Sequence, residues 1–101
     1  MHEVRQLPTV HLFVCANRRP AEAPLGPGCG KAGEDVYAAL KDEVARRRAF
    51  QSVWVTQTQC LGVCPKQGAT VAIYSGPSPR QTLLTEVVAS DVPALFAKVA
   101  S

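Results

Sequence analysis

Residues 10–15, with the sequence VHLFVC, form a short apolar run that is rich in β-branched and aromatic side chains and ends on Cys15. This composition is typical of a buried β-strand. Residues 52–58, SVWVTQT, form a second run of the same kind and lead toward Cys60. The two runs predict two strands, each of which carries the chain to a thiol.

Between these runs the sequence predicts an irregular loop followed by a helix. Residues 16–30 contain three prolines and three glycines and include Cys29, so neither helix nor strand is expected to persist there. From Gly33 onward, apolar residues recur every four positions, which is typical of an amphipathic helix. We expect the acids at 34–35 in its first turn and the three arginines at 46–48 in its last turn, where each favours the helix dipole.

The C-terminal half predicts a hairpin and a closing helix. Residues 70–74, TVAIY, and residues 82–88 have the composition of strands, and the turn-forming residues 75–80, SGPSPR, join them. These two strands should pair antiparallel. Ser90 offers an N-cap oxygen for a short final helix. The predicted order is β-α-β-β-β-α, an α/β fold with a mixed four-stranded sheet and two main helices.

The composition describes one ordinary folded domain. The chain has 101 residues, of which 47% are hydrophobic and 19% charged, with a formal net charge of +3. This composition excludes a disordered chain, and the length predicts a single domain over residues 1–101. No stretch approaches the roughly 20 apolar residues of a membrane span, and the N-terminal apolar run is too short for a secretory leader. We therefore expect a cytoplasmic protein with no membrane partner.

The four cysteines are Cys15, Cys29, Cys60 and Cys64, and their spacing is C-x13-C-x30-C-x3-C. A right-handed crossover makes the first two strands parallel, so their carboxyl ends share one edge of the sheet. Cys15 and Cys60 follow those ends, Cys29 precedes the helix that begins at the same edge, and Cys64 is one short turn beyond Cys60. We expect all four thiols to converge at this edge, where open α/β sheets usually bind ligands.

Three kinds of chemistry are open to such a set of thiols. In a reducing cytoplasm metal ligation is favoured over disulfides, because thiols are kept reduced there. Four thiolates complete either a structural zinc site or a [2Fe-2S] cluster. Zinc ribbons usually supply two tight pairs, whereas only Cys60 and Cys64 form a tight pair here, and the wide first gap suits a two-iron cluster. A thiol-disulfide redox protein that uses Cys60 and Cys64 is the third alternative, although thioredoxin-type exchange uses a CxxC pair.

Other residues offer weaker candidates for function. His2 lies near the terminus and His11 is four residues from the nearest cysteine, so neither is expected to ligate a metal. The arginines at 46–48 lack the interleaved aromatic residues of a nucleic-acid surface, so no nucleic-acid partner is expected. Trp54 alternates with valines and is expected to pack on the sheet. No constellation of catalytic type is present, and we expect no catalytic residues and no enzyme activity.

Five stretches of the chain carry a resemblance to a known family: HLFVCANRR, GCGKAGEDVYAAL, VTQTQCLGVCPKQG, TVAIY and SDVPALFAKV. They resemble the thioredoxin-like [2Fe-2S] ferredoxins, also called Shethna-type ferredoxins. The resemblance covers nearly the whole chain, and CGKAG and CLGVC are its most specific parts. It implies a thioredoxin-like fold, a free-standing one-electron carrier and, as in many relatives, a homodimer. It also implies one [2Fe-2S] cluster near the surface, with the ligands Cys15, Cys29, Cys60 and Cys64.

A carrier of this kind requires a redox protein as donor and another as acceptor. Arg18, Arg19, Lys31 and Lys66 all fall in the cysteine-bearing segments. A basic rim around the site would steer an acidic docking surface on the partner and speed its encounter. A solvated loop surface with no partner role is the alternative interpretation of these charges.

Overall fold

The computed structural model describes residues 1–3, 7–17, 29–59, 68–75 and 80–100. The elements follow the predicted order β-α-β-β-β-α, with a short 3-10 turn before the last helix, so the expected α/β fold is confirmed. They are β1 (Val10–Cys15), α1 (Gly30–Arg46), β2 (Val53–Thr58), β3 (Ala69–Ser75), β4 (Arg80–Val87), the 3-10 turn η1 (Ala89–Asp91) and α2 (Val92–Ala100).

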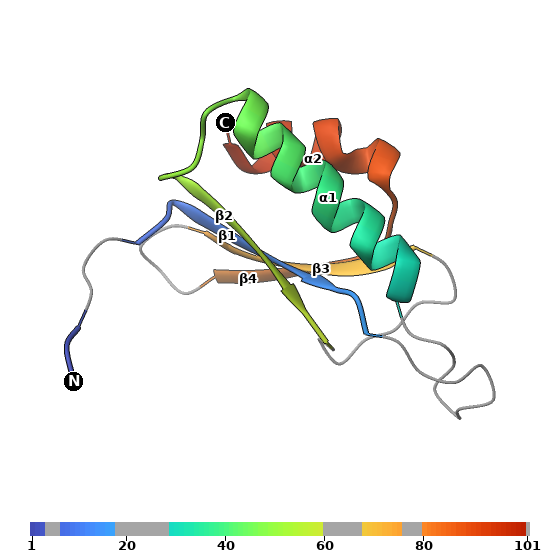
Figure 1. The fold of residues 1–101 in the computed structure, drawn as a ribbon, viewed down its shortest axis with the longest axis horizontal. Helices are drawn as coiled ribbons and strands as arrows, with labels where there is room; N and C mark the ends of the chain where they lie inside the picture. Colours follow the sequence, from blue (N-terminus) through green and yellow to red (C-terminus); the bar gives the residue numbers. More distant parts are fainter. Residues whose placement is uncertain (4–6, 18–28, 60–67, 76–79, 101) are drawn as a thin grey trace.

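The four strands form one sheet in the order β2-β1-β3-β4 (Figure 1). β1 and β2 are parallel, because α1 provides the crossover between them, and β3 is antiparallel to both β1 and β4. The strands therefore bring Cys15 at the end of β1, Thr58 at the end of β2 and Ala69 at the start of β3 to one edge of the sheet. We call this edge the cysteine edge.

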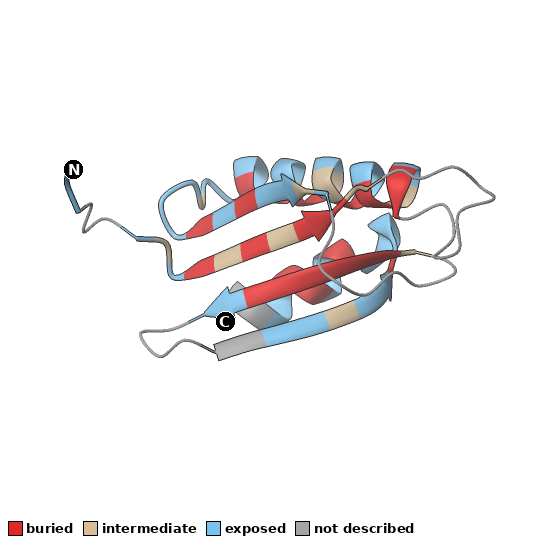
Figure 2. Cartoon of the chain, turned by 90° about the horizontal axis from the view of Figure 1, so that it is seen from below, coloured by how far each residue is buried: buried red, intermediate tan, exposed pale blue. Residues whose placement is uncertain are grey.

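Both helices cover the same face of the sheet, and the opposite face carries no helix within the described ranges (Figures 1 and 2). Alternate side chains of a strand point to opposite faces, which is why the apolar alternation of β1 and β2 places their valines and Leu12 under the helices. The largest side chains enclosed between the two layers include Phe96, Leu12, Leu40 and Val71, all at most 1% exposed. This packing fixes α1 against the parallel pair.

The uncovered sheet face, which we call the open face, is lined by aromatic rings. The ring of His11 stacks on Phe13 with centroids 4.0 Å apart, and Trp54 meets His11 edge-on at 5.6 Å. Tyr74 packs edge-on against Phe13 at 5.4 Å. Trp54 therefore packs on the sheet, as expected. Leu83 extends the open face onto β4. It pairs with Ala72 of β3, and Ala72 pairs with Phe13 of β1.

The first helix begins three residues earlier than the sequence predicts. The pattern indicates a start near Gly33, but α1 begins at Gly30, and the Gly33 N–H donates to the Cys29 carbonyl at 3.0 Å. The expected acids at 34–35 consequently lie beyond the first turn, which contains no acidic residue. At the other end only Arg46 lies in the last turn. The prediction failed because Gly30 was assigned to the proline- and glycine-rich loop 16–30, whereas it is the first residue of α1.

An acid upstream supports the arginine run. Glu43 is buried and forms ion pairs with Arg46 and Arg47, with 2.8 Å between the Arg47 Nε and the Glu43 Oε2. The Arg47 guanidinium also lies 4.7 Å from the centroid of the Phe96 ring. The contact between Arg47 and Phe96 ties the end of α1 to α2.

The predicted N-cap at Ser90 is wrong. Ser90 lies inside η1, and the Asp91 carboxylate accepts a hydrogen bond of 3.0 Å from the Val88 N–H. The chain thus enters α2 through a 3-10 turn, which the sequence pattern did not indicate. The bounds of β1 are as predicted, whereas β2, β3 and β4 differ from the predicted strands by one or two residues at one or both ends. The hairpin turn at 76–79 lies outside the described residues. None of the described helices is long and apolar enough to span a bilayer.

Candidate metal centre

Cys15 is held at the last position of β1 by contacts with the end of β2. Its side chain is fully buried, at 0% exposure. The Cys15 thiol donates to the Gln59 carbonyl at 3.2 Å, and the next residue, Ala16, donates its N–H to the Thr58 carbonyl at 2.9 Å. The thiol is therefore fixed beside the residue that directly precedes Cys60 in the sequence.

Cys29 reaches the same edge from the amino end of α1. It is the N-cap residue of the helix and is 3% exposed. Its carbonyl accepts the first bond of the helix, from Gly33, and the Gly30 N–H donates to the Asn17 carbonyl at 3.0 Å. Asn17 follows β1 by two residues, so this hydrogen bond ties the start of α1 to the chain just beyond Cys15.

Gly33 allows α1 to approach β1 closely. A Cβ at this position would lie 1.9 Å from the Cys15 carbonyl oxygen and 2.9 Å from the Ala16 Cα, and both atoms belong to the backbone. Real Cβ atoms do not approach backbone atoms to such distances, so only glycine fits here. The first turn of the helix, which begins beside Cys29, is thereby seated on the end of the strand that carries Cys15.

The structure brings two of the four predicted ligands to one edge, and the other two lie outside the described residues. Cys60 and Cys64 belong to segment 60–67, which joins Gln59 to Gly68. Gln59 follows β2 and Gly68 precedes β3, so the described residues on either side of the segment both lie at the cysteine edge, with β1 between them. Among the described residues, no group of three or more His, Cys, Asp or Glu side chains that could hold a metal is found.

Gly68 also has a packing role that the sequence did not reveal. Its φ is +73°, and a Cβ there would lie 2.5 Å from the backbone of Glu86. The contact coincides with a register irregularity between β3 and β4, near Ala69. The extra residue lies on β4, between Leu84 and Val87, and an irregularity of this kind increases the local twist of the strand pair.

Of the four cations expected around the site, Lys31 is the one in the described part of the chain. It lies in the first turn of α1, is 77% exposed and forms an ion pair of 3.1 Å with Asp35. Arg18, Arg19 and Lys66 fall outside the described residues.

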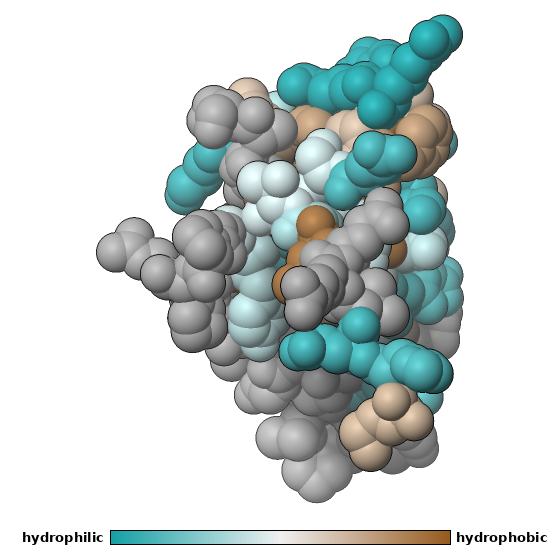
Figure 3. Space-filling view, turned by 90° about the vertical axis from the view of Figure 1, so that its left-hand side faces the viewer, coloured by the Kyte–Doolittle hydropathy of each residue, from teal (hydrophilic) through white to brown (hydrophobic). Residues whose placement is uncertain are grey.

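Figure 3 views the molecule from the end away from the cysteine edge, where hydrophilic residues predominate among those coloured and hydrophobic ones show only in small separate areas.

His11 lies on the open face, among the rings described above. Its Nε2 is 2.8 Å from the Thr56 Oγ1. Loss of water around the ring lowers the pKa of His11 below its ordinary value, because desolvation disfavours the charged imidazolium. The described partners of the His11 ring are thus the Thr56 hydroxyl and the rings of Phe13 and Trp54.

Sequence reasoning missed Asn17, Gln59 and Gly33, which position the cysteines through backbone atoms. A main-chain carbonyl carries no side-chain signature, so Asn17 and Gln59 could not be found from residue type. Gly33 does leave a signal, because a glycine inside an otherwise helical pattern usually has a packing reason. This signal was present in the sequence, because Gly33 stands at the start of the predicted helix.

No family model and no curated protein matches the chain. Solved structures do match. The wild-type thioredoxin-like [2Fe-2S] ferredoxin from Aquifex aeolicus is 25% identical, with 91% of this chain and 85% of that chain covered and a TM-score of 0.74. Another structure of a thioredoxin-like [2Fe-2S] ferredoxin from that organism is 23% identical, with 94% and 83% covered and a TM-score of 0.76.

Two further matches are variants of the Aquifex aeolicus ferredoxin in which one cysteine is replaced by serine. Each is 24% identical, covers 91% of this chain and 87% of that one, and has a TM-score of 0.76. These comparisons confirm the resemblance found in the sequence and the thioredoxin-like fold that it implies.

Replacing Gly33 by alanine should destabilise the protein. Helix propensity alone predicts a gain of about 1 kcal/mol, whereas the overlap with the Cys15 carbonyl predicts a loss of about 1–3 kcal/mol, as for other overpacked sites. Urea unfolding of Gly33→Ala measures the sign directly. A more stable variant would show that α1 does not depend on this close approach.

Stability should fall as the pH drops below about 6.5, the ordinary pKa of histidine. The pKa of His11 is lower in the folded state, so the folded protein binds fewer protons than the unfolded chain. The contribution of His11 to the free energy of unfolding is therefore present above pH 6.5 and is lost as the pH falls through the folded pKa. The His11→Gln variant should show a shallower loss of stability between pH 6.5 and 5, measured by urea unfolding. His2→Gln, at an exposed position, is the control and should keep the native slope.

Proposed function

We propose that this protein is a one-electron carrier that binds a single [2Fe-2S] cluster through Cys15, Cys29, Cys60 and Cys64. The observation that carries the proposal is the placement of two buried thiols, from two different elements, at one edge of the sheet. Gln59 and Gly68, which flank the segment with the other two cysteines, lie at that same edge. A ligand set drawn from separate elements suits a two-iron cluster, whereas a zinc ribbon takes its four ligands from two tight pairs.

The comparison with the Aquifex aeolicus ferredoxin supports the inclusion of Cys60 and Cys64. In its two serine variants the substituted cysteines are four positions apart. Cys60 and Cys64 are also four positions apart. The fold, the coverage and this spacing together favour a ferredoxin over a zinc-stabilised interaction module or a thiol-disulfide protein that uses Cys60 and Cys64. The same three observations favour an electron carrier over an enzyme. We also propose that the protein acts in the cytoplasm.

The described thiols fit the proposed cofactor. When bound, a [2Fe-2S] cluster accepts and releases one electron. Metal binding requires the Cys15 thiol to release the proton that it now donates to the Gln59 carbonyl, since a thiolate is the ligating form. Burial of Cys15 and Cys29 keeps water from both sulfurs. The hydrogen bonds of Ala16 and Gly30 hold the two backbones in place and so limit reorganisation on electron transfer.

Protein purified without oxygen should be brown and contain about two irons and two acid-labile sulfides per chain. Cys15→Ser and Cys29→Ser should each lower the bound iron and the visible absorbance, whereas Ala38→Ser, at an exposed position of α1, should leave both unchanged. Colourless protein with one zinc per chain would contradict the proposal, and so would metal-free protein with a reducible disulfide between Cys60 and Cys64.

We further propose that the redox partners dock through an acidic surface. The support for this idea is the set of cations in the cysteine-bearing segments, Arg18, Arg19, Lys31 and Lys66, together with a net charge of +3. Lys31 is highly exposed, although Asp35 offsets part of its charge. Attraction between complementary surfaces raises the rate of encounter and weakens with added salt.

Reversal of two of these charges tests the docking proposal. Arg18→Glu with Arg19→Glu should slow reduction by a strongly acidic one-electron carrier about tenfold at low salt, with little difference at high salt. Arg48→Glu is the control, because Arg48 lies beyond the far end of the 17-residue α1, about 26 Å from its start. Stopped-flow rates across a salt series measure the effect, and equal rates for both variants would contradict the steering role.

We also propose a homodimer that forms through the open face. The residues that share this face in the described register, Trp54, Thr56, His11, Phe13, Ala72, Tyr74 and Leu83, include no acid, lysine or arginine. Two copies related by a two-fold axis would therefore bring apolar rings together without opposing like charges.

Light scattering should give a mass twice that of the 10.8 kDa chain. Leu83→Lys should reduce it to the mass of one chain, because a buried unpaired lysine is costly. Val88→Lys has the same 43% exposure in the wild type and lies outside the register rows of the open face, so it should leave the dimer intact. A single-chain mass for the wild type, or equal behaviour of the two variants, would contradict this interface.

A further inference from the structure

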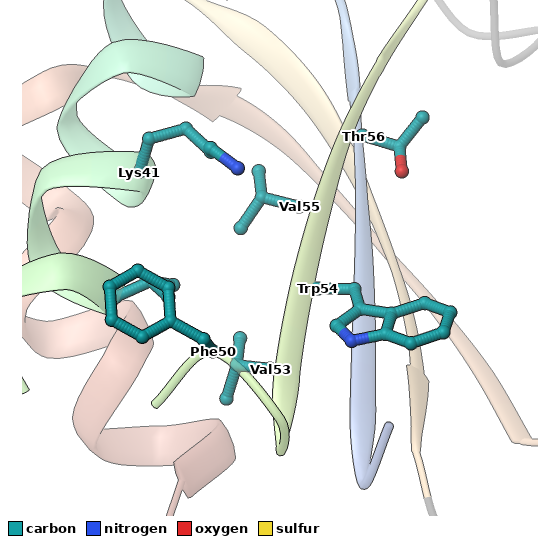
Figure 4. Close-up of a pocket in the computed structure, with 7 residues that line it drawn as sticks. Lys41, Phe50, Val53, Trp54, Val55 and Thr56 are labelled. Carbon is teal, nitrogen blue, oxygen red and sulfur yellow. The ribbon is translucent and has the colours of Figure 1, made fainter. Parts of the chain in front are cut away.

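A cavity of about 230 Å³ lies beside β2, at the side of the molecule away from β4. We call it the β2-edge groove. It is lined by Lys41 and Val44 of α1, Phe50 of the loop before β2, and Val53, Trp54, Val55 and Thr56 of β2 itself (Figure 4). Neither the cysteine edge nor the proposed cluster uses these residues.

The lining shows that the groove runs along the edge of the strand. Val53 and Val55 are buried toward the helices, whereas Trp54 and Thr56 point to the other side of β2, as Figure 4 shows. A cavity over one face of a strand would contact only alternate residues. Contact with four consecutive residues places the groove beside the edge of β2, where the next strand of the sheet would lie.

Backbone groups of β2 face this space. The carbonyls of Ser52 and Thr58 accept hydrogen bonds from Val10 and Ala16, so the even-numbered residues direct their backbone groups toward β1. The odd-numbered residues direct theirs outward, because backbone groups alternate along a strand. Accordingly, the Val53 N–H is bonded to the Ala49 carbonyl rather than to β1.

This leaves an open ladder of N–H and C=O groups at Val55 and Gln57. Within the described part of the chain, neither residue has a backbone partner on the outer side. β2 also lacks the devices that usually protect an edge strand, since its sequence VWVTQT contains no charge and no proline. An added strand can therefore pair with it in the manner of β-augmentation.

The chemistry of the groove indicates what kind of strand it accepts. Lys41 is its one charged lining residue, and its amino group points toward Val55 (Figure 4). Phe50 and Trp54 are 61% and 37% exposed and supply apolar surface. A second copy that added its own β2 by two-fold symmetry would bring no acid to Lys41, because β2 contains none. The groove thus favours an extended segment with apolar side chains and a carboxylate.

We propose that the β2-edge groove binds an extended acidic segment of a partner protein, which joins the sheet as a fifth strand beside β2. The backbone of the segment pairs with Val55 and Gln57. Its carboxylate meets the ammonium group of Lys41, and its apolar side chains pack against Phe50 and Trp54. The partner would contact the sheet edge while the cysteine edge stays accessible.

The test uses the purified protein and two blocked peptides, acetyl-Thr-Val-Glu-Val-Thr-amide and its analogue with Lys in place of Glu. The Glu peptide should give saturable NMR shifts and should slow hydrogen exchange of the Val55 and Gln57 amides several-fold. The amides of Trp54 and Thr56, which already pair with β1, are the internal control. Equal binding of both peptides, no saturable shift at millimolar peptide, or protection that depends only on protein concentration would overturn the proposal.

Two variants separate the contributions of charge and backbone. Lys41→Glu should weaken the Glu peptide at least tenfold and reverse the preference between the peptides, whereas Lys98→Glu, at an exposed position of α2 outside the groove, should change neither. Gln57→Pro removes one outward N–H, and proline is tolerated on edge strands. This variant should keep its fold and lose the peptide; retained binding by Gln57→Pro would show that no strand is added.

Discussion

The close contact between the first turn of α1 and the end of β1 is the constraint on which the rest of the site depends. Gly33 leaves no room for a side chain against the Cys15 carbonyl, and the hydrogen bond from Gly30 to Asn17 secures the same junction. Because of this contact, a residue at a helix N-terminus and a residue at a strand end deliver thiols to one place. Buried thiols held through backbone contacts are well suited to a cofactor that must change charge with little movement.

The two-layer architecture divides the surface into regions with different chemistry. The helices cover one face of the sheet, the open face carries uncharged rings, and the outer edge of β2 leaves backbone groups and Lys41 accessible. The cysteine edge is separate from the middle of β2, where the groove lies. The cysteine edge is thus separate from the open face and from the groove, whereas the open face and the groove share Trp54 and Thr56.

Much of the fold was predictable, because strand and helix periodicities and the handedness of the crossover leave few topologies. The run VHLFVC was assigned with its correct boundaries, and the parallel pairing followed from α1. The helix start was wrong because Gly30 was assigned to the preceding loop, and the Ser90 cap was wrong because the Val88 N–H donates to the carboxylate of the next residue along, Asp91. For the site, the sequence predicted the convergence of Cys15 and Cys29, whereas the carbonyls that fix them carry no signature of residue type.

The central claim is that the thiols at this edge hold one cluster that carries one electron. Electron paramagnetic resonance of the protein reduced with dithionite tests it most directly. The account predicts a silent oxidised sample and a rhombic signal on reduction that integrates to about one unpaired electron per chain, as for a single [2Fe-2S] centre. A sample that stays silent after reduction, with zinc or no metal bound, would contradict the account.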